Sequence, residues 1–415
     1  MSSFTAIKGF KDILPTESPI WRRIEDAARD VARRYDFQEL RPPIAEKTEI
    51  FARGIGQATD IVEKEMYTFV DKGDEKITLR PEATAGMVRA VIEHNLAEGG
   101  RAARLFCLGP MFRYERPQKG RQRQFHQLDV EVFGDPGPEV DAELLAWLTT
   151  FLKEIGLGDL SINLNSLGCP NCRPAFRKLL VEFFSARKEG LCPDCRRRLD
   201  LNPLRIIDCK SESCRKVVEG APKILEHLCG DCENHFETLK SLLDNLGLNY
   251  TVNPNLVRGL DYYTRTAFEV LSNDLGSQSA VAGGGRYDGL CKELGGADIP
   301  GIGFACGLER LVMLLKDKGG VEEPGPDYYL AVLDEAALTV AFRLAENLRS
   351  QGLRVAADWT PGSLKSRMKR ADKSGAAKVI MLGADEMAKK EATVRDLTTK
   401  VQTAFDLAPF FIAAD

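Results

Sequence analysis

The stretch from Gly109 to Gly134, GPMFRYERPQKGRQRQFHQLDVEVFG, constrains the fold more than any other part of the chain. It begins with residues that favour strands, passes through a basic loop at Pro117 to Gly120, and ends in a largely alternating run of apolar residues. This pattern predicts a β-hairpin with a long basic loop. Because side chains alternate across a strand, Gln127, Asp129 and Glu131 are expected on one face, which makes it a polar floor and not a core face.

Arg113 is expected within the first strand of this hairpin. A rigid guanidinium on a strand suits a fixed phosphate better than a mobile surface ion would. The alternative is a solvated basic loop on an edge hairpin, since five basic residues and one acidic residue lie between Arg113 and Arg123. The ordered mixture of Arg, Glu and Gln on the two strands favours a binding face.

The length of 415 residues predicts two or three domains. Apolar spacing predicts helices over 16–35 and 139–155, and a strand over 104–108 leads into the hairpin. The prolines between Arg41 and Ile44 suit a sheet edge or an interface. The predicted boundaries are a core over 1–325, a Cys-rich, mostly helical insertion over 168–246 within it, and an α/β unit over 326–415 that alternates strands and helices after a linker at about 319–327.

Composition excludes few functions. A net charge of −4 neither requires nor excludes a nucleic-acid partner, because a local basic surface can serve an acidic protein. One such surface is expected between Lys365 and Lys400, where ten basic residues face five acidic ones. No secretory signal or membrane-spanning run is seen, so a soluble, cytoplasmic protein with no membrane partner is expected. The run Gly283 to Gly285 fits no P-loop, so any ATP site is of another kind.

Eight cysteines fall in four close pairs, and in a reducing compartment such pairs argue for metal ligands ahead of disulfides. They could form two structural zinc sites of four thiolates, with one set nested inside the other. The alternative is a degenerate knuckle without metal. His227 and His235 flank the last pair and could substitute as ligands, but positions at the surface are favoured for them. The inner set is Cys192, Cys195, Cys209 and Cys214, and the outer set is Cys169, Cys172, Cys229 and Cys232.

Several separated strings together resemble the histidyl-tRNA synthetases of bacterial type, which are class II aminoacyl-tRNA synthetases. They span nearly the whole chain and are KGFKDILP, RPPIAEKTEIF with EKEMYTF, TLRPEATAG, GPMFRYERPQKGRQRQFHQ, RGLDYYTRTAFE, AGGGRYDGL, GFACGLERL and SLKSRMKRADKSGA. RGLDYY and AGGGRYDG are similar to strings specific to the histidine enzymes. Ala83 stands where many relatives carry Gly.

The resemblance implies an α+β core with an antiparallel sheet and flanking helices, and a C-terminal α/β domain that binds the anticodon region. It implies a homodimer that joins L-histidine to tRNA(His), using ATP with Mg²⁺. It assigns catalysis to Arg113, Arg258 and Arg310. The histidine site would comprise Glu82, Ala83, Thr84, Arg113, Gln127, Glu131, Arg258, Tyr262 and Tyr263; the ATP site Arg113, Arg121 and Arg310; and the contact with the tRNA acceptor end Arg116 and Gln118.

Other interpretations remain for these residues. Glu82 and Thr84 stand at a predicted helix start and would serve there as simple cap residues. Arg258 could be a structural ion-pair arginine. The whole chain could be an inactive paralogue that regulates an enzyme of histidine biosynthesis, or a zinc-knuckle RNA-binding module without chemistry. The C-terminal unit and the three arginines favour the enzyme.

Overall fold

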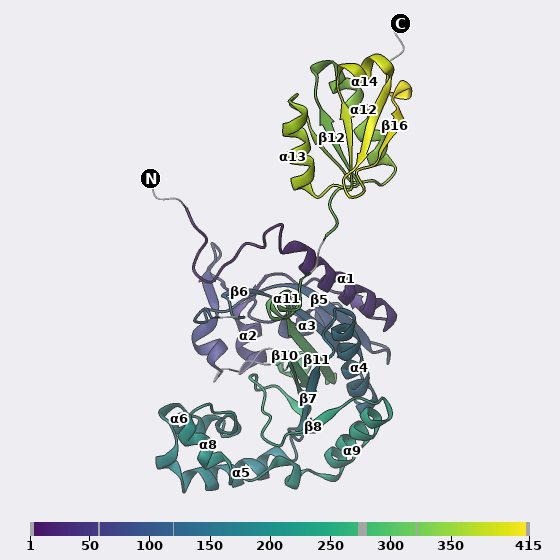
Figure 1. Ribbon diagram of the computed structural model, residues 1–415. Coiled ribbons are helices and arrows are strands. Elements are labelled where there is room, and N and C mark those ends of the chain that lie inside the picture. The colour runs from purple at the N-terminus through teal and green to yellow at the C-terminus, as the bar shows by residue number, and fades with distance from the viewer. Residues whose placement is uncertain (1–3, 57–58, 119, 273–279, 321–322, 412–415) are drawn as a thin grey trace. The chain divides into compact units, whose positions relative to one another are not determined.

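The computed structural model describes residues 4–56, 59–118, 120–272, 280–320 and 323–411, and the chain divides into two compact units, Met1–Val321 and Glu322–Asp415 (Figure 1). Each unit has its own sheet. Lys119 of the hairpin loop and residues 321 and 322 of the expected linker lie outside the described residues. None of the described helices is long and apolar enough to span a membrane.

An eight-stranded sheet forms the centre of the first unit. Its strands, in spatial order, are β1 (Gln38–Glu39), β5 (Ala103–Phe112), β6 (Gln124–Phe133), β11 (Gly301–Gly307), β10 (Ala280–Arg286), β9 (Thr264–Ser272), β7 (Leu160–Ser166) and β8 (Tyr250–Val252). Neighbours are antiparallel except at the two edges, where β1 joins β5 and β8 joins β7 in parallel. A small antiparallel sheet of β2 (Ala45–Lys47), β4 (Lys76–Leu79) and β3 (Tyr67–Val70) lies nearby in the sequence.

The predicted hairpin is the β5–β6 pair, which is in register from Ala103 opposite Phe133 to Phe112 opposite Gln124. The strand expected over 104–108 and the first hairpin strand are one continuous strand. Arg113 follows β5 directly instead of lying within it, and its backbone N–H still donates to the carbonyl of Arg123 at 2.9 Å. The expected alternation on the second strand is confirmed, because Leu128, Val130 and Val132 belong to a hydrophobic core on the opposite face.

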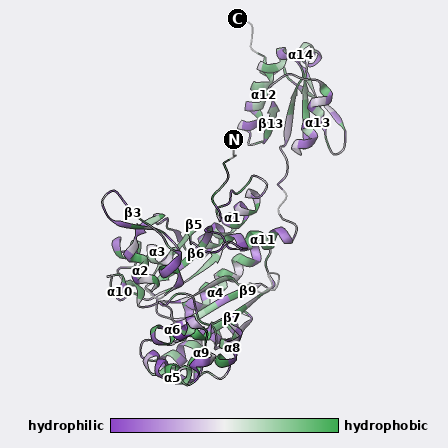
Figure 2. Ribbon diagram, turned by 90° about the vertical axis from the view of Figure 1, so that its left-hand side faces the viewer, coloured by the Kyte–Doolittle hydropathy of each residue, from purple (hydrophilic) through white to green (hydrophobic). Residues whose placement is uncertain are grey.

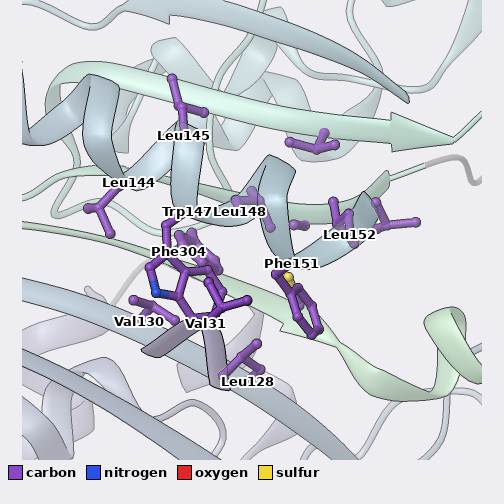
Figure 3. Close-up of a cluster of buried hydrophobic side chains, with 14 of the residues drawn as sticks. Val31, Leu128, Val130, Leu144, Leu145, Trp147, Leu148, Phe151, Leu152 and Phe304 are labelled. Carbon is purple, nitrogen blue, oxygen red and sulfur yellow. The ribbon is translucent and has the colours of Figure 1, made fainter. Parts of the chain in front are cut away.

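The face of the sheet that carries Leu128, Val130 and Val132 is called the first face. Four helices cover it: α1 (Ser18–Arg34), α4 (Pro138–Glu154), α9 (Gly230–Asn245) and α11 (Leu308–Asp317). Figure 2 shows hydrophobic and hydrophilic residues alternating along α4 and α9, and apolar positions recurring every three or four residues turn one side of a helix inward. Figure 3 shows Trp147, Leu148 and Phe151 of α4 over Val130 and Phe304 of the strands. This core keeps the sheet in place from behind.

The second face of the sheet is covered more sparsely. It carries α3 (Thr84–Glu93) and α10 (Leu290–Glu293), with α2 (Thr48–Ile55) and the short helix η1 (Ile61–Glu65) next to them. The helix expected from about Thr84 begins at that residue. Met87 and Val91 pack there with Tyr262, Tyr263 and other apolar residues. The polar side chains of β6 point to this face, and the functional site forms beside this smaller core.

A buried ionic network ties α4 to the sheet. The Arg286 guanidinium lies 2.6 Å from Asp141, and neither side chain is exposed. Thr266 donates to the same carboxylate at 2.5 Å. His235 of α9 lies 3.6 Å from it and is 7 % exposed, so the expectation of a surface histidine was wrong. Burial lowers the pKa of His235 to about 4.

The Cys-rich insertion, residues 168–246, is described throughout and contains only helices and turns. These are α5 (Arg173–Ser185), η2 (Lys188–Gly190), α6 (Pro193–Leu201), α7 (Leu204–Ile207), α8 (Glu212–Val218), η3 (Ile224–His227) and α9. Figure 1 shows α5, α6 and α8 gathered beyond β7 and β8. They share a small core of their own, built around Phe176, Leu180 and Phe184, whereas α9 packs into the first-face core.

The second unit is a mixed five-stranded sheet with helices. The strand order is β13 (Val355–Asp358), β12 (Tyr328–Val332), β14 (Lys378–Leu382), β15 (Glu391–Asp396) and β16 (Gln402–Asp406), and the helices are α12 (Leu338–Ser350), α13 (Leu364–Ser374) and α14 (Ala384–Lys389). The first three strands are parallel and the last two antiparallel. Arg367 of the expected basic surface is buried and paired with Asp358, so it supports the fold.

Candidate active site

A cavity of about 330 Å³ opens on the second face of the eight-stranded sheet. Residues from β6, β10 and β11 form its floor, and the loop from Arg258 to Tyr263 forms one wall. A Cβ atom at Gly303 would overlap Glu131, and one at Gly283 would overlap the Arg258 guanidinium. The glycine-rich strings of the sequence therefore make room for side chains in this cavity.

Three carboxyl groups are buried side by side at one end of the cavity. The Glu82 carboxylate accepts backbone N–H groups of Thr84 at 3.0 Å and Ala85 at 2.9 Å, which makes it a cap of α3 as well as a lining residue. Glu131 accepts hydrogen bonds from the Thr84 hydroxyl at 2.7 Å and from the Tyr287 hydroxyl. Neither carboxylate oxygen of Asp129 has a hydrogen-bond partner among the described residues.

Burial of these carboxyl groups sets their ionisation. Desolvation raises the pKa of Asp129 well above its usual value, and the nearby Glu82 carboxylate raises it further. Desolvation also raises the pKa of Glu131 well above its usual value, although the bonds from Thr84 and Tyr287 oppose the shift. Buried acids of this kind favour a cation that supplies N–H donors. The side-chain oxygen of Gln127, also without a partner in the described part of the chain, offers a further acceptor.

Guanidinium groups surround the other end. Arg113 is fixed by a 2.8 Å bond to the Pro81 carbonyl and lies over the Phe125 ring. Arg310 lies in the first turn of α11 and donates to the Ala280 carbonyl. Burial lowers the pKa of Arg310, and the like charge of Arg121 adds to that effect. Fixed cations that repel one another in a cavity favour a polyanionic ligand such as a chain of phosphates.

Arg258 bridges the two ends of the cavity. Its guanidinium pairs with Glu269 at 3.3 Å and lies 5.8 Å from the centre of the Tyr263 ring. The buried Nε atom has no acceptor within the described residues. The pairing with Glu269 fits the structural interpretation of Arg258, and the unused donor in the cavity fits the catalytic one.

The cavity gathers most of the residues singled out from the sequence. Those that line it are Glu82, Thr84, Arg113, Arg121, Gln127, Glu131, Arg258, Tyr262, Tyr263 and Arg310. Ala83 does not line it, because its side chain is buried in the second-face core. Arg116 and Gln118 are exposed on the hairpin loop outside the cavity.

Sequence reasoning gave no role to Asp129 or Tyr287. Asp129 lies between Gln127 and Glu131 on the polar face of β6, so the period of two already placed it there. Tyr287 belongs to the string AGGGRYDGL, but its bond to Glu131 joins residues 156 positions apart and has no local signal. Glu309 was also missed: it accepts from the backbone N–H of His126 at 2.9 Å and lies 3.0 Å from its ring, which fastens α11 to β6 next to Arg310.

The two thiol clusters expected in the insertion are both assembled. The four sulfur atoms of Cys169, Cys172, Cys229 and Cys232 lie within 4.8 Å of one another, as do those of Cys192, Cys195, Cys209 and Cys214. The Sγ atom of Cys169 lies 3.7 Å from that of Cys172 and 3.8 Å from that of Cys229, and the Sγ atoms of Cys192 and Cys209 lie 3.9 Å apart. A tetrahedron of thiolates about 2.3 Å from a zinc ion has edges of about 3.8 Å, so both sets could hold such an ion.

Comparisons with known proteins agree over the whole chain. A family model described as histidyl-tRNA synthetase matches residues 9–311, and one described as anticodon binding domain matches 314–411. A protein of Nitratidesulfovibrio vulgaris (strain DP4) named histidine–tRNA ligase is 52 % identical over 97 % of this chain and 96 % of its own length, and one of Geobacter sulfurreducens with the same name is 50 % identical over 99 % of each.

Two solved structures show the same fold. The apo histidyl-tRNA synthetase of S. aureus matches with a TM-score of 0.83 and 35 % identity, covering 98 % of this chain and 100 % of its own. A Bacillus halodurans protein described as an ATP phosphoribosyltransferase regulatory subunit/histidyl-tRNA synthetase matches with a TM-score of 0.65 and 21 % identity, covering 92 % of this chain and 100 % of its own. At that identity the second likeness concerns the fold alone.

Proposed function

The chain belongs to the histidyl-tRNA synthetase family, and we propose that it activates L-histidine with ATP and transfers the histidyl group to the 3′ end of tRNA(His). The observation that carries this proposal is a cavity with buried carboxyl groups at one end and fixed arginines at the other. The α-ammonium of an amino acid suits the end with the carboxyl groups. Its carboxylate, which is joined to the α-phosphate of the nucleotide, suits the end with the arginines.

The carboxyl end is assigned to the histidine. Its α-ammonium supplies the donors that Asp129 and Gln127 lack, with Glu82 and Thr84 beside them. Glu131 and Tyr263 are assigned to the imidazole, with Tyr262 next to them. Because both ring nitrogens then have a polar partner, an analogue without them leaves buried groups unpaired, which can discriminate by about 10⁴ to 10⁵.

The arginine end is assigned to the phosphates of ATP. Arg113 holds the α-phosphate and stabilises the charge of the in-line transition state, while Arg310 and Arg121 bind the outer phosphates. Arg258 reaches the carboxylate of the amino acid and the same α-phosphate. Mg²⁺ is expected to accompany the nucleotide as a counter-ion, and Glu115 and Glu269 on the wall of the cavity offer oxygens to it.

Two displacements complete the reaction. A carboxylate oxygen of histidine attacks the α-phosphorus and pyrophosphate leaves, which gives histidyl-adenylate. A hydroxyl of the terminal ribose of tRNA then attacks the histidyl carbonyl and AMP leaves. Arg116 and Gln118, exposed on the hairpin loop, are assigned to the acceptor end, and the second unit to the anticodon region.

Each thiol cluster of the insertion is assigned one Zn²⁺. Four thiolates fill all positions of a tetrahedral ion, so the metal would support folding and take no part in catalysis. Elemental analysis should find about two zinc ions per chain by this assignment. If the protein contains iron in place of zinc, the identity of the metal is wrong but the two sites stand. If it contains no metal, the assignment is rejected.

We also infer a homodimer that works in the cytoplasm, where tRNA is charged. The segment from Arg41 to Ile44 resembles the class II motif found at the subunit interface, and Ile44 is 45 % exposed in the single chain. Light scattering of the purified protein tests this inference, since a monomer at micromolar concentration would contradict it.

The alternative of a regulatory subunit without activity has less support. The curated relatives match over nearly the full length and are named as ligases. The anticodon binding model covers residues 314–411. The arginines assigned to catalysis line the cavity.

Exchange of labelled pyrophosphate into ATP, measured with each of the twenty amino acids and no tRNA, tests the proposal. Exchange with histidine alone is the expected result. Arg116→Ala serves as a matched control, because it should retain exchange and lose part of the transfer to tRNA. No exchange with any amino acid, from folded protein, would reject the enzymatic function.

A further inference from the structure

The loop from Gly259 to Tyr263 is held to the catalytic core by apolar packing of Leu260, Tyr262 and Tyr263, but by few polar bonds. It carries Tyr262 and Tyr263 into the cavity and follows directly on Arg258. One backbone bond, from Asp261 N–H to the Ile55 carbonyl at 3.3 Å, ties it to the end of α2. Most of its other polar partners come from the Cys-rich insertion.

The segment between Cys195 and Cys209 binds this loop at two points. Arg205 donates from Nε to the Asp261 carboxylate at 3.1 Å and from Nη2 to the Gly259 carbonyl at 2.5 Å. The Asn202 amide donates to the same Asp261 oxygen at 2.9 Å. Charge-assisted bonds of this kind are stronger than neutral ones.

The same segment also binds η1, which lies beside this loop, since Leu260 packs against a cluster that contains Ile61. Arg197 pairs with Glu63 through both of its terminal nitrogens at 3.1 Å, and Arg198 pairs with Asp60 at 3.1 Å. Glu63 belongs to η1, whose Ile61 and Glu65 line the cavity. A single stretch of chain, enclosed by ligands of one thiol cluster, therefore binds two neighbouring segments that both contribute lining residues to the proposed active site.

The other cluster reaches the far end of the loop. Arg173 follows Cys172 at the start of α5 and donates to the Tyr263 carbonyl, and its Nε donates to the Leu167 carbonyl at 3.3 Å. The outer cluster thus acts beside Tyr263 and the inner one beside Gly259 and Asp261.

Packing across this seam is loose. A cavity of about 380 Å³ separates the insertion from the loop and is lined by residues of both, among them Leu204, Arg205, Leu260 and Asp261. This pocket is partly open to solvent, so the two surfaces are in direct contact over only part of the seam. On this side the loop is therefore fixed by a few polar bonds in addition to the packing of its tyrosines in the core, and these bonds depend on where the two clusters hold α5, α6 and α7.

We propose that Arg173, Asn202 and Arg205 are positioning residues, through which the two four-thiolate metal sites set the loop that carries Arg258, Tyr262 and Tyr263. The inference rests on the proposed function. It gives the insertion a role in positioning the histidine site, and this role does not depend on contact with tRNA. Misplacement of a binding group by about 1 Å can cost about 100-fold in rate, so loss of these bonds should act on the histidine site first.

The test uses the full chain with Asn202→Ala and Arg205→Ala combined. The expected protein keeps its metal, shows a KM for histidine raised about 10- to 100-fold in pyrophosphate exchange, and takes up deuterium faster over residues 257–263. Arg205→Lys should recover part of the loss. Arg187→Ala is the matched control, because Arg187 bonds to Phe183 inside the insertion and should leave both readouts unchanged.

Removal of the metal by a chelator completes the test. Stripped wild-type protein should show the same faster uptake over 257–263, and stripping should add little to the double variant. Unchanged uptake in stripped protein, or wild-type kinetics in the double variant, would overturn the proposal. If the double variant does not fold, Asp261→Ala removes the acceptor from the loop side and is judged by the same readouts. Failure of the proposed function is distinguishable, since wild-type protein would then show no exchange while the deuterium measurement still tests the seam.

Discussion

The eight-stranded sheet and the Cys-rich insertion both place charged side chains at one cavity, but they are held by different means. The sheet rests on a large apolar core under α1, α4, α9 and α11 and on a ten-residue strand ladder. The separately packed part of the insertion has a small core around Phe176 and Phe184 and two thiol clusters. Small cores usually need such staples. The floor of the cavity is therefore held by apolar packing, whereas the insertion beside it is held by a small core and its two thiol clusters.

Metal removal should separate the two regions most sharply. Apparent binding free energies of structural zinc in peptides are about 10–16 kcal/mol, more than a core of this size supplies. In stripped protein, or with Cys195→Ser, amides of residues 172–228 should lose protection against hydrogen exchange while those of β5 and β6 keep it.

Cys291→Ala provides the control for this prediction, since Cys291 is buried within α10, belongs to neither thiol cluster and should not alter metal content. Equal loss of protection in the sheet would show that the two regions unfold together. It would contradict the view that they are stabilised by different means.

A buried charge in the sheet region should matter next. Asp141→Asn removes the fully buried one of the two carboxylate partners of Arg286, while the partly exposed Asp288 stays in place. Breaking a buried pair from one side costs about 3–5 kcal/mol. The free energy of unfolding should fall by that amount. It is measured by urea titration of a Trp359→Phe background, with the fluorescence of Trp21 and Trp147 as the probe.

The control is Glu143→Gln on the same helix. Glu143 pairs with Arg104 at the surface, with 35 % and 27 % of the side chains exposed, and such pairs contribute about 1 kcal/mol or less. A similar small loss for Asp141→Asn would mean that packing alone holds this region. Metal content should be unchanged in both variants.

Arg113→Ala tests catalysis without touching either means of support. Loss of one fixed donor from a developing anion costs about 10²- to 10³-fold in kcat, or about 2.7–4 kcal/mol of transition-state stabilisation. Pyrophosphate exchange should fall by this factor while unfolding and zinc content stay as in the wild type. Arg104→Ala changes a partly exposed residue of β5, the strand that leads to Arg113, and should leave exchange unchanged. An equal loss there would point to a general effect of the hairpin.

The sequence predicted much of the sheet region and little of the seam, and the physical reason is the range of the interactions. Alternation along β6 and the start of α3 at Thr84 are local patterns and were found. The strand β16 is short and exposed and is defined by its pairing with β15, so it was missed. The burial of His235, the bond from Tyr287 to Glu131 and the contacts of Arg205 with Asp261 join distant parts of the chain, where periodicity carries no information.

The smallest expected effect is a change in bound protons when histidine enters the cavity. Burial raises the pKa of Asp129 and of Glu131 in the free protein. The α-ammonium, assigned beside Asp129, stabilises the charged form of that carboxyl group, so the pKa of Asp129 falls on binding. Between the bound and the free pKa values protons are released, up to about one from this carboxyl group, and the affinity for histidine should rise with pH in that window. The number of protons released is measured by calorimetric titration in two buffers of different ionisation enthalpy. The titration is done at about pH 7.5, where the imidazole of free histidine is mostly neutral. Asp129→Asn should reduce the release, which places part of it at this residue; proton uptake on binding would contradict the assignment of the carboxyl end to the ammonium.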